Sequence, residues 1–345
     1  TIIVPSWRSD VEHYSDIAEE VARFFGYNNL PVTLMRGQTT RGGLNAKQKA
    51  EVLATSTCRS LGYSEIMTYS FISPSYYDKV RMPVDSPKRD SIRILNPLGE
   101  DTSIMRTTAV PSMLEVLARN EHYHNPKAML YELARIYGKR EGTAMADERQ
   151  DLILGAYGGG MDFFRLKGAV EAILKAFRVD GVSYTANAER PAFHPGRCAD
   201  VTVNGQVIGT LGEIHPLVAK NYDVTNRMYL ARLDFTALLA LEHTEITYKP
   251  LPKYPSVARD IAVVCDADLP VGELEACIAK SGKGLVKEIA LFDIYTGAPI
   301  PAGKKSVAFS LKLRSEDHTL TDAESDEDVK AILAALDQEK GAVLR

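Results

Sequence analysis

The first helical pattern lies near the N-terminus, where apolar residues repeat with the period of an α-helix. These apolar positions, at i, i+4, i+7 and i+8, are Ile17, Val21, Phe24 and Phe25. Ser15 or Asp16 is the expected N-cap, and Gly26 can end the helix. Because so short a helix cannot bury an apolar face alone, we expect residues 1–31 to pack on later residues or on an upstream part of the chain. The missing initiator Met favours a processed chain or an excised fragment.

A mixed pattern extends over residues 32–247. Residues 32–40 form a polar connector, and residues 45–62 carry helical spacing. Farther along, two strong helical patterns near 109–120 and 165–177 alternate with short β-rich runs. These runs are EIMTYSF, SIRIL, AMLYELARIYG, DLILGAYG and RMYLARLDF.

A hairpin is expected within this region, in the stretch ADVTVNGQVIGTLG. Its two alternating runs are joined by Asn204 and Gly205, and this dipeptide supplies the positive φ angles that both central residues of a type I′ turn require. Residues 32–247 are therefore predicted to form a mixed, largely antiparallel α+β domain.

The stretch YKPLPKYPS predicts an interdomain linker. Its prolines cannot donate to a sheet ladder, and they restrict the residues before them. After it, residues 252–345 show the order strand, helix, strand, strand, helix, strand, which is the split β-α-β-β-α-β motif of ferredoxin-like domains. The second helix, near 321–340, begins with a capping box made by Thr321 and Glu324.

Composition identifies a folded chain and narrows its partners. Hydrophobic residues at 45% and charged residues at 25% are ordinary globular values, and no run approaches the roughly 18 apolar residues that a membrane span needs. A net charge of −4 argues against non-specific binding of polyanions, so any nucleic-acid contact is expected to be local. Four scattered cysteines without a C-x-x-C pair indicate neither a zinc knuckle nor a disulfide framework, and they favour the cytoplasm.

An acidic set near the N-terminus is the first candidate site. Asp16, Glu19 and Glu20 lie at i, i+3 and i+4 on one side of the predicted helix, and Asp10 lies six residues upstream. Such hard oxygen ligands suit Mg²⁺. The alternative is that acids in a first helical turn simply complement the helix dipole, at roughly 0.3–1 kcal/mol each.

Two other motifs could form a functional site, but their patterns favour structural roles. The run of three glycines before Asp162 is typical of a strand-to-helix turn, because neither a P-loop nor a dinucleotide fingerprint is present. His194 and His215, each followed by Pro, are interpreted as loop anchors, since no third ligand lies at a recognisable spacing.

In residues 252–345, cations interleave with aromatics such as Phe292 and Tyr295 on or beside the predicted sheet, a combination that suits single-stranded RNA. The RNA-binding candidates are Arg259, Lys304, Lys305, Lys312, Arg314 and Tyr254. The alternative is a solvated charged face, because this stretch holds 12 Lys and Arg against 16 Asp and Glu, a net charge of −4.

Several runs together resemble the C-terminal part of the bacterial phenylalanyl-tRNA synthetase β subunit. They are VPSWRSDVEHYSDIAEEVARFFGYNNLP, LNPLGEDTSIMRTTAVPSMLEVLARN, DFFRLKGAVEAIL, FHPGRCADVTVNGQVIGTLGEIHP, KYPSVARDIAVVCD, FDIYTGAPIPAGKKSVAFSL and TLTDAE. The resemblance covers almost the whole chain. It implies a class II ligase of two α and two β subunits that joins phenylalanine to tRNA(Phe) using ATP and Mg²⁺.

The resemblance also implies a domain organisation. Residues 1–31 would be the tail of a small helical domain, 32–247 a catalytic-like class II synthetase core with an antiparallel sheet, and 252–345 a ferredoxin-fold anticodon-binding domain. The family's D-x(5)-D-x-x-E-E magnesium motif falls on Asp10, Asp16, Glu19 and Glu20.

No catalytic residue is assigned, because the class II ATP-binding arginines are echoed only faintly, by Glu132 with Arg135 and by GGGMDFFR. The core would support the α-subunit active site, and helix 109–120 is a candidate docking surface for that subunit. The alternative is a free-standing RNA-binding or scaffold protein derived from a synthetase.

Overall fold

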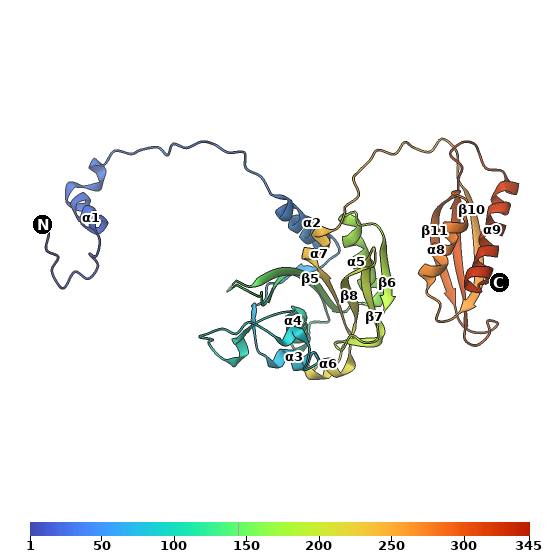
Figure 1. Ribbon diagram of the computed structural model, residues 1–345, viewed down its shortest axis with the longest axis horizontal. Helices are drawn as coiled ribbons and strands as arrows, with labels where there is room; N and C mark the ends of the chain where they lie inside the picture. The colour runs from blue at the N-terminus through green and yellow to red at the C-terminus, as the bar shows by residue number, and fades with distance from the viewer. Residues whose placement is uncertain (144) are drawn as a thin grey trace. The chain divides into compact units, whose positions relative to one another are not determined.

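The computed structural model describes residues 1–143 and 145–345, and the chain divides into two compact units, Thr1–Glu245 and Ile246–Arg345 (Figure 1). A seven-stranded sheet with the order β1-β4-β5-β9-β8-β7-β6 dominates the first unit. All its pairings are antiparallel except that of β1 with β4. The strands are β1 (Ser64–Glu65), β4 (Lys127–Gly138), β5 (Asp147–Gly158), β6 (Val182–Ala186), β7 (Phe193–Val203), β8 (Gln206–Ile214) and β9 (Met228–Asp234).

Helices bury both faces of this sheet. The strand β5 shows this most clearly, since Leu152 and Leu154 belong to one core cluster while Ile153 and Tyr157 belong to the other. The helices α2 (Ala46–Ser60), α5 (Phe163–Ala176) and α7 (Phe235–Ala240) pack in the first cluster. The helix α4 (Val110–His122) packs in the second, near α3 (Ser75–Lys79) and α6 (Pro216–Asn221).

Glycine permits the close approach of α4 to the sheet. A Cβ added at Gly155 would lie 2.7 Å from Cγ of Met113 and 2.8 Å from Cδ1 of Leu117. The predicted hairpin is confirmed, because β7 and β8 are joined by Asn204 and Gly205 with φ angles of 48° and 83°.

Two predicted strands are wrong. The run EIMTYSF forms only the last residue of the two-residue β1 and the first of β2 (Phe71–Ile72), and SIRIL contributes an isolated bridge from Arg93 to Ile104 beside β3 (Ile104–Met105). The face of EIMTYSF that carries Met67 and Tyr69 stays uncovered in the described unit, since these residues are 94% and 83% exposed. Apolar alternation therefore had no buried face to pair with.

The N-terminal helix, α1 (Tyr14–Phe25), lies where the pattern predicts it, and Gly26 ends it at φ 94°. Its N-cap is His13 rather than Ser15 or Asp16, and Asp16 occupies the third helical position. None of its residues is buried, and a short 3₁₀ turn, η1 (Tyr27–Asn29), comes next.

The second unit has the predicted strand and helix order. Its four-stranded sheet has the order β11-β12-β10-β13, and α8 and α9 pack on one face with their own apolar core. The elements are β10 (Val257–Asp266), α8 (Val271–Ser281), β11 (Val286–Tyr295), β12 (Lys304–Leu313), α9 (Asp322–Lys340) and β13 (Val343–Leu344). The capping box of Thr321 and Glu324 is present at the start of α9.

No helix in residues 1–143 and 145–345 is long and apolar enough to cross a membrane. The four cysteines are free and buried.

Candidate functional site

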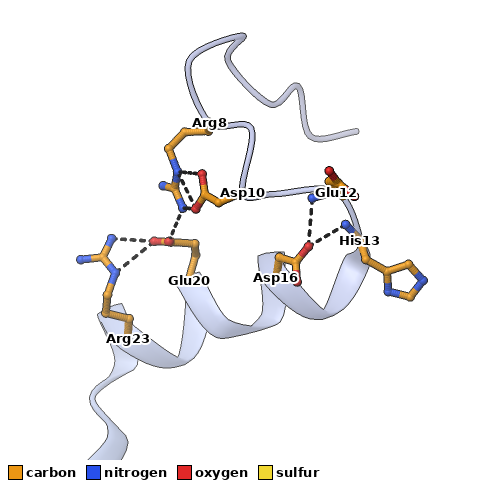
Figure 2. A network of polar contacts seen from close by, with 7 residues as sticks. All are labelled: Arg8, Asp10, Glu12, His13, Asp16, Glu20 and Arg23. Atoms are coloured by element: carbon orange, nitrogen blue, oxygen red, sulfur yellow. Dashed lines mark hydrogen bonds and ion pairs between the residues drawn. The ribbon is translucent and has the colours of Figure 1, made fainter. Parts of the chain in front are cut away.

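Arg8 lies between Asp10 and Glu20, two of the predicted metal ligands (Figure 2). The Arg8 guanidinium donates to both carboxylate oxygens of Asp10, and its Nη2 lies 2.7 Å from Asp10 and 2.6 Å from Glu20. Arg23, one helical turn after Glu20, binds the other oxygen of the Glu20 carboxylate at 2.6 Å. Hydrogen bonding by Arg8 lowers the pKa of Asp10 and of Glu20.

Asp16 and Glu19 lie apart from this guanidinium. The Asp16 carboxylate accepts hydrogen bonds from the backbone N–H groups of His13 at 2.7 Å and Glu12 at 2.9 Å, and these bonds lower its pKa. It therefore closes the capping box of α1, as the dipole alternative anticipates. Glu19 is exposed and has no side-chain hydrogen bond to the residues that the structure describes.

As placed, these four acids do not fit a magnesium ion. The charges of Asp10, Asp16 and Glu20 are already compensated by guanidinium and N–H groups, and across the described parts of the chain no group of three or more His, Cys, Asp and Glu is disposed to hold a metal. Binding of Mg²⁺ would require Arg8 to leave Glu20.

The RNA-binding candidates divide between the two faces of the second sheet. Cross-strand partners point to the same face, and Lys305 is opposite the buried Cys265, so Lys305 faces the helices. Arg259 shares that face, where it binds Asp322 at 2.7 Å and Asp326 at 3.2 Å, both at the start of α9. Neither side chain belongs to the face that the helices leave open.

Lys304 and Lys312 do lie on the open face, each beside an acid. Lys304 binds Asp266 at 2.7 Å, and Lys312 binds Glu288 at 2.8 Å. Of the candidate cations, Arg314 has no side-chain partner among the residues that the structure describes. Tyr254 lies in the linker and is half-buried.

Two aromatic residues on the edge strand β11 add a stacking surface. Phe292 is 59% exposed at an irregularity of the strand. Tyr295 is 39% exposed, and its hydroxyl donates to the Ala298 carbonyl. The sequence places both residues on or beside the sheet, but which side of the sheet stays uncovered depends on the packing of the helices.

A buried ion pair in the first unit escaped the sequence analysis. Arg106 donates to Glu132 at 3.0 Å, to Thr68 and to the Arg135 carbonyl, and Arg106 and Glu132 are 1% and 4% exposed. The Glu132 carboxylate is therefore held in a buried ion pair with Arg106. Arg135 instead makes a surface pair with Glu148.

The glycine run and the two histidines have local structural roles. Gly158 has φ 69°, and a Cβ there would lie 2.2 Å from the Pro126 carbonyl oxygen. Asp162 then caps α5, as the turn interpretation predicts. Nδ1 of His194 accepts from Gly196, and that of His215 accepts from Leu217, so both anchor loops.

Three family models match the chain in succession. Residues 1–27 match the tRNA synthetase B5 domain, residues 30–235 the phenylalanyl tRNA synthetase beta chain CLM domain, and residues 252–345 the ferredoxin-fold anticodon binding domain. The phenylalanine–tRNA ligase beta subunit of Clostridium acetobutylicum is 41% identical over 346 aligned residues, which cover 100% of this chain. The chain belongs to the phenylalanine–tRNA ligase beta subunit family.

Other members of the family show the same extent of similarity. The beta subunits of Clostridium tetani and Moorella thermoacetica are 40% and 38% identical, again over 100% of this chain. The alignments cover 43% or 44% of these three relatives, so the chain spans less than half their length.

Among solved structures, pyrrolysyl-tRNA synthetase from Desulfitobacterium hafniense is similar with a TM-score of 0.48 and 14% identity, over 69% of this chain and 82% of that one. A second structure from that organism, named PylSc, has a TM-score of 0.46 and 13% identity, over 65% of this chain and 74% of that one.

Proposed function

We propose that this chain is the C-terminal part of the β subunit of phenylalanine–tRNA ligase, which attaches phenylalanine to tRNA(Phe) with ATP. The observation that carries the proposal is the 41% identity that runs through both units. A free-standing RNA-binding or scaffold protein is not favoured, because each of the three successive matches belongs to synthetase architecture.

The first unit would be a class II synthetase-like core without catalytic activity of its own. Its antiparallel sheet, covered on both faces, supports that assignment. The buried pair of Glu132 with Arg106 supports the absence of catalysis, because that carboxylate is already bound. Its role would be to support the active site of an α subunit within a cytoplasmic α2β2 complex.

The test mixes the chain with the α subunit of the same organism. We expect a stable α–β complex by gel filtration, and no phenylalanine-dependent pyrophosphate exchange by the chain alone. Exchange by the purified chain above a no-protein control would overturn the non-catalytic role. Failure to bind α would overturn the assignment to a subunit interface.

We also propose that the acidic set binds Mg²⁺ only when an α subunit supplies further ligands, because Arg8 neutralises Asp10 and Glu20 in this chain. Asp16→Asn with Glu20→Gln should then weaken α–β assembly, and the loss should grow with Mg²⁺ concentration. Asp147→Asn with Glu148→Gln, two acids at the start of β5 that each bind an arginine, is the matched control. Subunit affinity that does not depend on Mg²⁺ in the unsubstituted chain would leave only the capping role of Asp16.

A further inference from the structure

A cavity of about 290 Å³ in the first unit contains none of the acidic or RNA-binding candidates. Its size lies near the lower end of small-molecule pockets, roughly 300–1,000 Å³. One part of its wall is apolar, formed by Val80, Met82, Val110, Phe193 and Ile208. Another part is cationic, because Lys88, Arg190 and Arg232 all line the cavity.

Both arginines are held rigidly by carboxylates behind them. Arg232 on β9 binds the fully buried Asp151 through Nε and Nη2, each at 2.7 Å. Arg190 binds Asp200 through the same two nitrogens at 3.0 and 2.9 Å. Such forked pairs fix the guanidinium planes, and they leave Nη1 of each arginine without a hydrogen bond in the described part of the chain.

Lys88, in the 3₁₀ turn η2 (Pro87–Arg89), is the unpaired charge of this cavity. Its ammonium makes no ion pair and no hydrogen bond with any residue that the structure describes. Desolvation, followed by the charges of Arg232 and Arg190, lowers the pKa of Lys88, although Asp151 and Asp234 act in the opposite direction. Asp234, which also lines the cavity, caps α7 by accepting a hydrogen bond from the Ala237 N–H.

We propose that this cavity binds a small carboxylic acid with an apolar body. The acid's carboxylate would pair with Lys88 and accept from the free arginine nitrogens, while its body would cover the apolar wall. Asp151, which acts on Lys88, already binds Arg232, and Asp234 caps a helix, so an added anion supplies the partner that the protein itself does not. The three cations and three carboxylates balance, so we expect modest, millimolar affinity.

The experiment measures equilibrium binding of hexanoate to the full chain at low ionic strength, with hexanamide and inorganic phosphate as comparison probes. Hexanoate should bind more tightly than hexanamide, which lacks the charge, and than phosphate, which lacks the apolar body. Lys88→Met should weaken hexanoate binding about tenfold or more, because a charge-assisted contact is lost. Lys88→Gln keeps a hydrogen-bond donor, so its affinity for hexanoate should lie between those of the unsubstituted chain and of Lys88→Met.

Lys220→Met is the matched control, because Lys220 is also exposed and unpaired within the described residues but lies on α6 outside the cavity. Equal binding of hexanoate by the Lys88 and Lys220 variants would overturn the proposal. So would equal binding of hexanoate and hexanamide, or no binding of hexanoate at millimolar concentration. If phosphate bound more tightly than hexanoate, the proposed contact between the ligand and the apolar wall would be wrong, and the cavity would be a simple anion site.

Discussion

Arg106 and Glu132 form a buried, fully hydrogen-bonded ion pair. The side chains are 2% and 5% exposed, and Arg106 joins the segment before β2 to the strand β4 through Thr68 and the Arg135 carbonyl. Removing one partner leaves a buried charge without compensation, which typically costs about 3–5 kcal/mol.

Arg106→Met should therefore lower the free energy of unfolding of the first unit by about 3–5 kcal/mol. Arg135→Met is the control, because the Arg135–Glu148 pair is about half exposed and should contribute roughly 0–1 kcal/mol. Denaturant-dependent hydrogen exchange of the β4 and β5 amides measures both. Similar losses in the two variants would show that the buried pair is not special.

Asp328 on α9 is the opposite case, a buried carboxylate without a partner. It is 1% exposed, and neither oxygen accepts a hydrogen bond from the described residues. Desolvation raises the pKa of Asp328, and the charge of Glu327 adds to this while Lys283 opposes it. A raised pKa in the folded state means that ionisation destabilises the fold as the pH rises through this range.

Asp328→Asn should raise the free energy of unfolding at neutral pH by about 1–3 kcal/mol, because the amide replaces a charge that is costly to bury. The gain should vanish below the ordinary pKa of Asp, 3.8, where the carboxyl is protonated in both states. Hydrogen exchange of the α9 amides at several pH values checks this. Asp337→Asn, an exposed acid on the same helix, is the control, and a loss of stability in Asp328→Asn would contradict the destabilising effect of this carboxylate.

A capping box holds the first turn of α9. The Thr321 hydroxyl accepts from the Glu324 N–H, and the Glu324 carboxylate accepts from the Thr321 N–H at 2.9 Å. Hydrogen bonds from Thr321 and then from His318 lower the pKa of Glu324 to about 2. The folded-state pKa is below the ordinary value of 4.5, so this contribution is present above pH 4.5 and is lost as the pH falls toward 2.

Thr321→Ala should destabilise α9 by about 1 kcal/mol at neutral pH. Glu324→Gln should flatten the acid-side loss of α9 stability between pH 4.5 and pH 2, because the titrating group is gone. Circular dichroism and hydrogen exchange of residues 321–345 report the effect. Asp337→Asn, in the last turn of the same helix, controls for charge removal, and an unchanged acid profile in Glu324→Gln would refute the assignment.

Local patterns predicted those elements whose signals are themselves local. The capping box located α9, the Asn204–Gly205 turn located the β7–β8 hairpin, and the helical pattern near 165–177 after the glycine turn located α5. Alternation failed for EIMTYSF, because a strand pattern needs a covering layer and Met67 stays exposed. That information lies in tertiary packing.

In the candidate sites, too, local features could be predicted from the sequence, whereas contacts between distant segments could not. Helical spacing correctly put Asp16 and Glu20 on α1, but it could not show that Arg8 reaches across twelve positions to Glu20. Likewise, the Arg106–Glu132 pair joins segments whose proximity only the sheet creates. For the second unit, the order of strands and helices along the chain could be predicted, whereas the helix-side position of Arg259 and Lys305 depends on the register.

The division into two units makes the role of residues 252–345 separable from that of the core. The second unit has its own apolar core between its sheet and the helices α8 and α9, so its removal leaves both cores of the first unit intact. Four of its five candidate cations already bind acids or a carbonyl, so few are free to bind phosphate. An RNA contact here would therefore combine exposed aromatics such as Phe292 with a small number of cations.

Deleting residues 252–345 from the complete α–β enzyme should abolish most tRNA charging while pyrophosphate exchange stays nearly unchanged, because the proposed RNA contact is lost and the core is not. In the intact enzyme, Arg314→Ala should raise the KM for tRNA more than Lys280→Ala, since Lys280 lies on α8 and is paired with Glu339. The salt dependence of tRNA affinity should be shallow, because few phosphate contacts release few counterions. Paired assays of exchange and aminoacylation decide the matter. Equal loss in both would mean that the unit only stabilises the enzyme, and no loss in either would mean that it does not bind this tRNA.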